Sequence, residues 1–280
     1  MPSINALAPD KLVRLLGTRR APSIVDVRSD VAFAAEPRLI PGAIRRPFAG
    51  LADWAPRFAH SAVVVVCEDG GAIGHGAAAW LRDAGADADV LDGGIRRWAG
   101  AGLPMLDSSA LPAGDAAGRT LWVTRARPKV DRIACPWLIR RFVDPQAQFL
   151  FVPTAHVVGV AQQMGAVPFD IEAEGVRWTH DGERCTFDVM LKGFGLGCVD
   201  GLERLARIVR GADTARPDVA PEAAGLLAIS LGLSRLYSND LEQLEAGIGI
   251  YDALYRWCRD ATDETHDWTS HQPAKSRVTA

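Results

Sequence analysis

Residues 62–74 restrict the fold more than any other stretch of this chain, with the sequence AVVVVCEDGGAIG. Four consecutive valines indicate a strand that is buried on both faces, as in a parallel sheet covered by helices. The strand ends at Cys67, a glycine-rich loop follows, and residues 77–82 then show a helical pattern. A thiol at this position faces unpaired backbone N–H groups and the positive end of the helix dipole, which both stabilise a thiolate. The alternative is a small buried cysteine that only packs.

Strands and helices alternate on both sides of this stretch. The patterns predict a helix at residues 9–17, a strand at 23–28 and a second strand after the turn at Pro41. They also predict a strand at residues 88–91, followed by a glycine turn and a last helix. This alternation indicates an α/β domain with a mostly parallel sheet.

The amino-acid composition limits the binding partners and the cellular compartment that can be expected. The chain has 280 residues, 48% hydrophobic and 23% charged, with a net charge of −3 and a pI near 6.1. These values indicate a globular protein and give no global signal for nucleic acid. No basic and apolar leader and no apolar run of about 18 residues is present, so neither secretion nor a membrane span is expected. Five cysteines without a CxxC motif suit individual thiols in a reducing cytoplasm.

Four spaced motifs within residues 5–105 carry a family resemblance. They are Asp26–Val27–Arg28, Ile40–Pro41–Gly42–Ala43, the Cys67 loop and Gly93–Gly94–Ile95. Together they resemble a rhodanese domain, a fold whose loop cysteine carries sulfane sulfur as a persulfide. The resemblance implies that Cys67 is a persulfide-forming nucleophile. It also implies a catalytic site around it that is made of Gly70, Gly71, Asp26 and Arg28.

The Cys67 loop departs from the pattern of active rhodaneses. The arginine and serine usual at the fifth and sixth positions after the cysteine are replaced by Ala72 and Ile73. Glu68 and Asp69 also add negative charge beside the thiolate. An anionic donor such as thiosulfate should therefore react poorly, because its transition state loses a cation and meets two carboxylates. A smaller or neutral sulfur donor, a protein persulfide or another thiol reaction is favoured.

The composition divides the chain into four segments. Residues 1–105 form the α/β domain, and residues 106–120 are rich in Pro, Gly, Ser and Ala and indicate a linker. Residues 121–260 are expected to form an α+β domain that begins with strands and ends in several helices. The polar tail at residues 261–280 is expected to be disordered.

A basic segment opens the second domain. Arg125, Arg127 and Arg132 lie within a few residues of one another, with Asp131 as the one acid of the segment. One interpretation is a solvated charged face. The other is an oxyanion-binding rim, because the guanidinium fork matches tetrahedral oxyanions.

The dipeptide Asp181–Gly182 lies between two alternating runs and predicts a β-hairpin with a two-residue turn. Such a hairpin places His180, Glu183 and Cys185 on one face. With Asp170 as an added candidate, these side chains are predicted to bind a metal ion or to support a redox reaction. The alternative is a structural hairpin with a hydrogen-bonded histidine and a packed cysteine.

The second domain also resembles a family. Val123–Thr124–Arg125, Val130–Asp131–Arg132, Trp137–Phe142, His180–Phe187 and Tyr251–Tyr255 look like the C-terminal domain of chromate-resistance proteins. That family includes chromate-responsive regulators of an efflux system. Their N-terminal regulatory half is replaced here, and no helix-turn-helix with a basic recognition helix stands out, so a transcriptional role is not implied.

Two hypotheses follow for the whole chain. In the first, which we favour, the protein is a sulfurtransferase-like enzyme in which Cys67 takes sulfur from a small-molecule or protein persulfide. In the second, it is a non-catalytic sensor or binding protein with a degenerate rhodanese loop. The ligand of such a sensor would be chromate, a similar oxyanion or a metal ion. Under either hypothesis, the candidate cofactor is a metal ion bound in the second domain.

Overall fold

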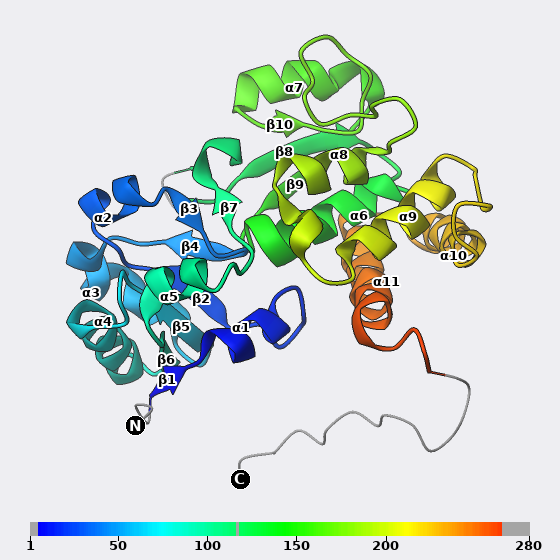
Figure 1. Cartoon of the computed structure of the whole chain (residues 1–280). Helices are drawn as coiled ribbons and strands as arrows, with labels where there is room; N and C mark the ends of the chain where they lie inside the picture. Colours follow the sequence, from blue (N-terminus) through cyan, green and yellow to red (C-terminus); the bar gives the residue numbers. More distant parts are fainter. Residues whose placement is uncertain (1–4, 116–117, 265–280) are drawn as a thin grey trace.

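The computed structural model describes residues 5–115 and 118–264 (Figure 1). Residues 265–280, most of the predicted tail, lie outside the described residues. The first half contains a five-stranded sheet in the order β1-β6-β5-β2-β4, in which each neighbouring pair is parallel. Its strands are β1 (Ala6–Leu7), β2 (Ser23–Asp26), β4 (Ala43–Arg45), β5 (Ala62–Val66) and β6 (Asp87–Leu91). The predicted parallel α/β fold is therefore confirmed.

Helices cover both faces of this sheet. They are α1 (Pro9–Leu15), α2 (Asp30–Ala35), α3 (Leu51–Trp54), α4 (Ala72–Asp83) and α5 (Gly94–Gly100). Val63 and Val65 of the central strand β5 pack in the cluster that contains side chains of α3 and α4, while Val64 and Val66 pack in the cluster that contains side chains of α1 and α5. The valine run is thus buried on both faces, as its sequence predicts.

The predicted linker contains regular structure. Strand β7 (Leu106–Asp107) pairs antiparallel with β3 (Arg38–Leu39), and the Leu106 side chain is buried in the core. A short 3₁₀ turn at Ser108–Ala110 follows. Strand pairing and a buried apolar side chain therefore fix the start of the predicted linker.

The second half begins with a three-stranded parallel sheet in the order β10-β8-β9. Its strands are β8 (Leu121–Arg125), β9 (Gln148–Val152) and β10 (Val167–Pro168). Helix α7 (Val157–Met164) packs against Val123 on one face, and helix α6 (Asp131–Leu138) shares the main core with Trp122 on the other. Figure 1 shows α7 and α6 on opposite sides of the strands.

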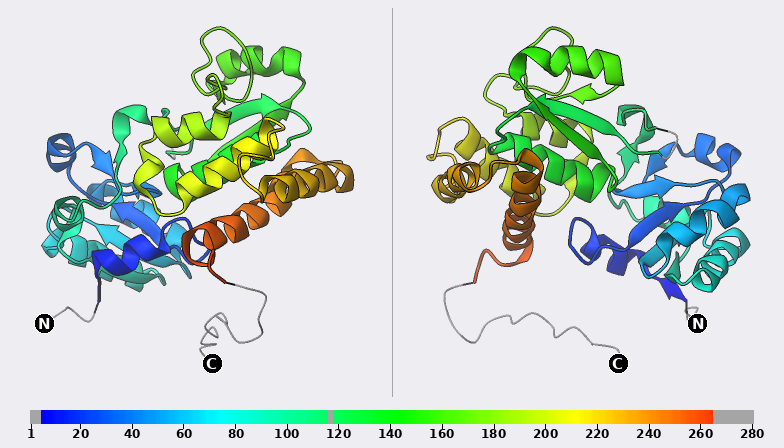
Figure 2. Two further views of the ribbon diagram at one scale, coloured as in Figure 1. Left: turned by 45° about the vertical axis from the view of Figure 1, so that its right-hand side comes forward. Right: turned by 180° about the vertical axis from the view of Figure 1, so that it is seen from behind.

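Four helices follow in the described part of the second half, namely α8 (Thr186–Gly193), α9 (Leu202–Asp213), α10 (Ala223–Leu236) and α11 (Asp240–Asp260). Figure 2 shows α10 at the end of the molecule away from the first sheet. Asn239 caps α11 by accepting hydrogen bonds from the N–H groups of Leu241 and Glu242. Within the described residues, no helix has the length and apolar character that crossing a membrane requires.

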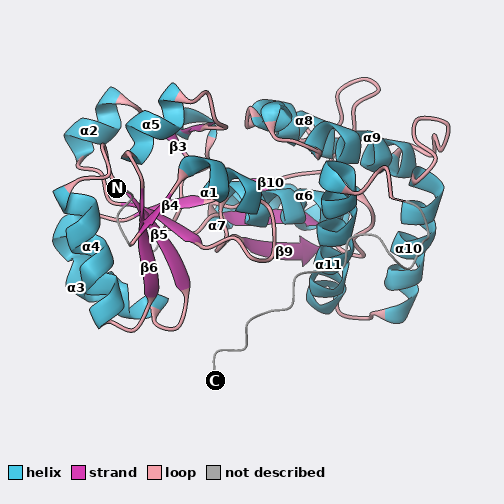
Figure 3. Ribbon diagram, turned by 60° about the horizontal axis from the view of Figure 1, so that its bottom comes forward, coloured by secondary structure: helices cyan, strands magenta, loops and turns pink. Residues whose placement is uncertain are grey.

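The two halves share one hydrophobic core. A single cluster contains Leu12 and Leu16 of the first half together with Phe142 and Tyr255 of the second. The backbone N–H of Gly42 donates to the Phe142 carbonyl at 2.6 Å, which links the halves directly. Figure 3 shows α1 beside the second half, between the two sheets.

Candidate functional site

The Cys67 loop is fixed by close backbone packing. Cys67 follows β5, and the next turns of the chain lie against the glycine turn at Gly93–Gly94. The N–H of Ile95 donates to the Cys67 carbonyl at 2.9 Å. A Cβ atom on Gly94 would lie 2.5 Å from that carbonyl oxygen, and one on Gly70 would lie 2.7 Å from the Gly93 nitrogen. Only glycine fits at these positions, because both also have a positive φ.

The Cys67 thiol is buried below the first turn of α4. The residue is 2% exposed, and a Cβ on Gly74 of that turn would lie 2.8 Å from the sulfur. Among the five cysteines, Cys198 is the exposed one. A bulky alkylating reagent should therefore reach Cys198 before Cys67.

The two acidic residues after Cys67 have different surroundings. The Asp69 carboxylate accepts a hydrogen bond from the Gly71 N–H at 2.9 Å, and its Oδ1 lies 3.9 Å from the Cys67 sulfur. Glu68 forms an ion pair with Arg96 on the surface. Asp69 thus occupies the Gly71 N–H group, whereas the Glu68 carboxylate is paired with Arg96.

Asp26 and Arg28 form a buried ion pair beside β2. The Arg28 side chain is 0% exposed and that of Asp26 is 1% exposed, with 2.6 Å between Nη2 and Oδ2. Arg28 also donates to the carbonyls of Glu36 and Arg38, each at 2.8 Å. These bonds hold the chain between β2 and β3, which assigns the pair a structural role near the loop.

A second group of polar side chains lies at the carboxyl edge of the three-stranded sheet. His180 Nε2 is 3.2 Å from Asp213 Oδ2, 3.5 Å from Asp170 Oδ1 and 3.7 Å from Asp131 Oδ2. We call these four residues the carboxylate–histidine cluster. Asp170 follows β10, and Asp131 begins α6 after β8. In open α/β sheets, ligands bind at this edge.

An unusual backbone conformation positions Asp131. The preceding residue, Val130, has a φ of 31°, which is an outlier for a β-branched side chain. Its N–H donates to Ser230 of α10 at 2.9 Å, and its carbonyl accepts from the Tyr251 hydroxyl of α11 at 3.0 Å. Two helices from the end of the chain therefore hold the start of α6, and with it the Asp131 carboxylate.

Burial and neighbouring charges set the protonation of the cluster. Burial raises the pKa of Asp131 well above its usual range, and the charges of Asp213 and Asp170 raise it further. Burial also favours a higher pKa for Asp170, but hydrogen bonding with His180 and the charge of Arg125 outweigh it and lower that pKa. The hydrogen bond to Asp170 raises the pKa of His180. The cluster thus holds three carboxylates close together, and the negative charge of Asp170 is the one best balanced by its neighbours.

Two arginines compensate Asp170. Arg125 Nη2 lies 3.1 Å and Arg132 Nε lies 3.2 Å from Asp170 Oδ2, and the Thr186 hydroxyl donates to Oδ1 at 3.0 Å. Arg127, whose φ is 61°, points elsewhere and bonds to the Tyr237 carbonyl. The three predicted arginines therefore do not form one rim, because the backbone turns at Arg127.

The predicted hairpin is wrong. Asp181 pairs with Arg184 across a turn in which Gly182 has a φ of 60°, so the turn lies one residue later than predicted. Helix α8 then begins at Thr186 in place of a second strand. The Glu183 side chain, 86% exposed, pairs with Arg216 and lies outside the cluster.

Two of the four predicted metal ligands, His180 and Asp170, come together in the cluster. Cys185 is buried at the N-terminus of α8, where its thiol donates to Asp188 at 3.3 Å. Sequence reasoning missed Asp131 and Asp213 as site residues. Asp131 had one signal, its position as the lone acid in a basic segment, whereas Asp213 ends α9 without any local signal.

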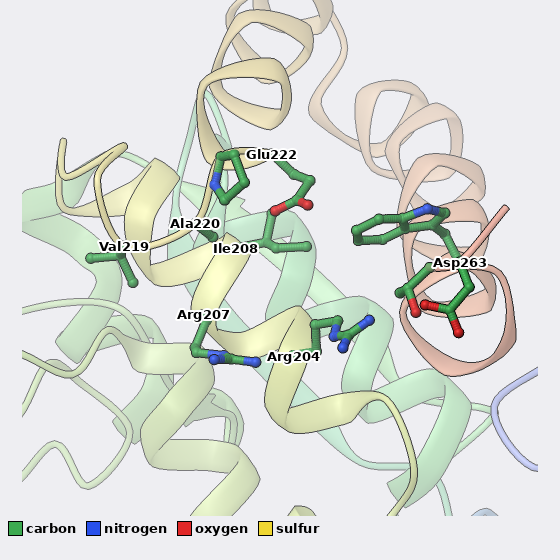
Figure 4. Close-up of a pocket in the computed structure, with 10 residues that line it drawn as sticks. Arg204, Arg207, Ile208, Val219, Ala220, Glu222 and Asp263 are labelled. Carbon is green, nitrogen blue, oxygen red and sulfur yellow. The ribbon is translucent and has the colours of Figure 1, made fainter. Parts of the chain in front are cut away.

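A surface hollow of about 360 Å³ lies between α9, α11 and the loop before α10 (Figure 4). Arg204 and Arg207 line it together with Trp257, and Glu222 and Asp263 supply two carboxylates. Since the two signs of charge balance, the hollow has no evident preference for an anion or a cation.

Both halves of the chain match known families. Residues 8–101 match the model of the rhodanese-like domain, and residues 122–258 match that of the ChrB C-terminal domain. Protein ChrB of Cupriavidus metallidurans is 38% identical over 134 residues, which are 48% of this chain and 39% of ChrB. The match therefore spans about two fifths of that relative.

Solved structures resemble the first half. A rhodanese-like domain protein from Staphylococcus aureus is 27% identical, with 34% of this chain and 91% of that chain covered and a TM-score of 0.31. Thiosulfate sulfurtransferase from Pseudomonas aeruginosa is 26% identical, and the match covers 38% of this chain and 20% of that chain with a TM-score of 0.31. The two family matches place a rhodanese-like domain at residues 8–101 of this chain and a ChrB C-terminal domain at residues 122–258.

Proposed function

We propose that the chain is a sulfur-carrying protein of chromate resistance in which Cys67 forms the persulfide. The observation that carries this proposal is the position of Cys67. It follows the central strand of a parallel sheet, where ligands bind in such folds, within a loop whose glycines permit backbone-to-backbone packing. The link to chromate resistance is supported by the match of the second half to the ChrB domain.

The chemistry is a transfer of one sulfur atom. The Cys67 thiolate attacks the outer sulfur of a thiol persulfide, R–S–SH. A new S–S bond forms, the S–S bond of the donor breaks, and its electron pair leaves on the thiolate R–S⁻. The outer sulfur keeps its proton, so the product is a Cys67 persulfide and no external oxidant is needed. A thiol acceptor reverses the same steps.

Asp69 restricts the choice of donor. Its carboxylate lies beside the sulfur and occupies the Gly71 N–H. The thiosulfate dianion would meet this charge without a compensating arginine in the loop. A persulfide on a small thiol or on a protein carries less charge and is the donor that we propose.

Intact-mass measurement tests the proposal directly. After incubation with a low-molecular-weight thiol persulfide, the chain should gain the mass of one sulfur atom, reversible by a reducing thiol. Cys67→Ser should abolish the gain, and the matched variant Cys198→Ser, at the exposed thiol, should retain it. Loading that persists in Cys67→Ser would place the chemistry at another cysteine.

Asp69→Ala should increase loading from thiosulfate. The change removes a negative charge near the sulfur and frees the Gly71 N–H for the donor. One hydrogen bond to a charged group contributes about 1.5–3 kcal/mol, which corresponds to roughly ten- to a hundred-fold in rate. Mass spectrometry of samples quenched at successive times gives the loading rate. Glu68→Ala is the control and should change it little, because Arg96 already compensates Glu68. Equal effects of both variants would contradict the role of Asp69.

A second candidate function is the binding of chromate or a related oxyanion without sulfur transfer. The burial of Cys67 at 2% exposure favours it, since this thiol packs with core side chains. Arg125, with 38% of its side chain exposed, and Arg132 would supply the guanidinium groups. Calorimetric titration with chromate should then give heat that Arg125→Ala reduces, whereas the sulfur-transfer function leaves chromate unbound.

A further inference from the structure

We propose that the carboxylate–histidine cluster binds one divalent transition-metal ion, with Asp131, Asp170 and His180 as ligands and with the Asp213 carboxylate beside His180. This site is independent of Cys67 and of sulfur transfer. It differs from the set that the sequence suggests, because Asp131 takes the place of Glu183 and Cys185.

The spacing of the donor atoms fits an ion. One atom from each of Asp131, Asp170 and His180 lies within 4.8 Å of the others. A metal with bonds of about 2.0–2.2 Å to nitrogen and oxygen places its ligand atoms about 3–4 Å apart. The three distances from His180 Nε2, 3.2, 3.5 and 3.7 Å, are within this range.

One atom of the cluster indicates a ligand independently. Asp131 is 0% exposed, and its Oδ1 has no hydrogen-bond partner among the described residues. Its other oxygen, Oδ2, accepts from the Phe187 N–H at 3.3 Å. A buried carboxylate oxygen without a partner is costly. A cation bound by both oxygens of the Asp131 carboxylate would satisfy it.

The charges of the cluster also favour a cation. Three carboxylates approach one imidazole, while the guanidinium groups of Arg125 and Arg132 both approach Asp170. Asp131 receives the N–H of Phe187, and Asp213 receives that of Asp131 at 3.4 Å. No arginine or lysine among the described residues forms an ion pair with Asp131 or Asp213. A divalent ion would neutralise these two carboxylates.

The donor types indicate the class of metal. Carboxylate oxygen suits Mn²⁺ and Mg²⁺, and imidazole nitrogen suits Zn²⁺ and Fe²⁺, so a mixed set favours a first-row transition metal over Ca²⁺. The Thr186 hydroxyl on Asp170 provides the outer hydrogen bond that usually orients a metal ligand. His180 and Asp213, with side chains 36% and 18% exposed, leave an approach from solvent.

Equilibrium dialysis of the full chain tests the site. After treatment with a chelator, the protein is dialysed against Mn²⁺ or Zn²⁺, with Ca²⁺ as the comparison ion, and the bound metal is measured by atomic emission. We expect one Mn²⁺ or Zn²⁺ per chain. Asp131→Asn and His180→Ala should each weaken binding by more than about 100-fold, and Thr186→Val by about 10–100-fold.

Two matched variants serve as controls. His156→Ala removes an exposed histidine, and Glu183→Gln removes the exposed acid next to the cluster in sequence. Both should retain full binding. Circular dichroism confirms folding, and Asp131→Asn keeps the shape of the buried side chain. The site is refuted if the wild type retains neither metal, or if the Asp131 and His180 variants bind as the wild type does.

Discussion

Replacement of Arg28 by alanine should lower the free energy of unfolding by about 3–5 kcal/mol. The change leaves Asp26 as a buried carboxylate without its cation, which is the costly way to break a buried ion pair. It also removes the hydrogen bonds to the carbonyls of Glu36 and Arg38. Urea denaturation followed by circular dichroism measures the loss.

Arg38→Ala is the matched control. Arg38 forms an ion pair with Glu36, but its side chain is 48% exposed, so its loss should cost less than about 1 kcal/mol. The comparison also separates two roles for Arg28, which the sequence places in the catalytic site. If Arg28→Ala abolished persulfide loading while the protein unfolded at the urea concentration of the wild type, a catalytic role would replace the structural one.

Gly17→Ala should be the most damaging glycine substitution at the junction of the two halves. Gly17 has a φ of 72°, and a Cβ there would lie 2.1 Å from a Phe142 ring atom and 2.8 Å from one of Tyr255. Both rings are buried, so neither can move away without disturbing the shared core. A left-handed conformation costs an L-residue about 1–2 kcal/mol, and overpacking adds about 1–3 kcal/mol.

Gly102→Ala provides the comparison for Gly17→Ala. Gly102 has a similar φ of 65°, but no atom lies within 4 Å of the position that a Cβ there would occupy. It should therefore show the conformational cost alone. Thermal unfolding of the two variants measures the difference, and equal melting temperatures would contradict the tight packing of Phe142 and Tyr255 against Gly17.

The first half of the fold could be predicted from local sequence because its signals are local. The valines of β5 indicate burial on both faces, and Gly70 and Gly94 have the positive φ that their turns require. The roles of Asp26 and Glu68 could not be predicted in this way. They depend on which arginine lies opposite in space, and the sequence leaves that open.

The prediction of a hairpin at Asp181–Gly182 failed for a physical reason. Asp181–Gly182 favours a tight turn, and a turn does form, but Thr186 and Phe187 are buried on a helix that packs on α6. Cys185 and Asp188 close a capping box at its start. Tertiary packing and this cap outweigh the strand preference of an alternating run.

The carboxylate–histidine cluster could be predicted only in part. His180 and Asp170 carry local signals, but Asp131 and Asp213 are 82 positions apart and meet because α6 packs beside α9. Even the orientation of Asp131 depends on Ser230 and Tyr251, which are more distant still. Contacts over such separations are a property of the folded chain.

The shared core has a consequence for how this protein unfolds. A rhodanese domain that folds alone needs a polar outer surface, yet here Leu12 and Leu16 meet the aromatic side chains of the second half. A cut at the family boundary would expose these apolar side chains to water on both fragments. The two halves are therefore expected to unfold in one transition, and the whole chain is the unit that folds.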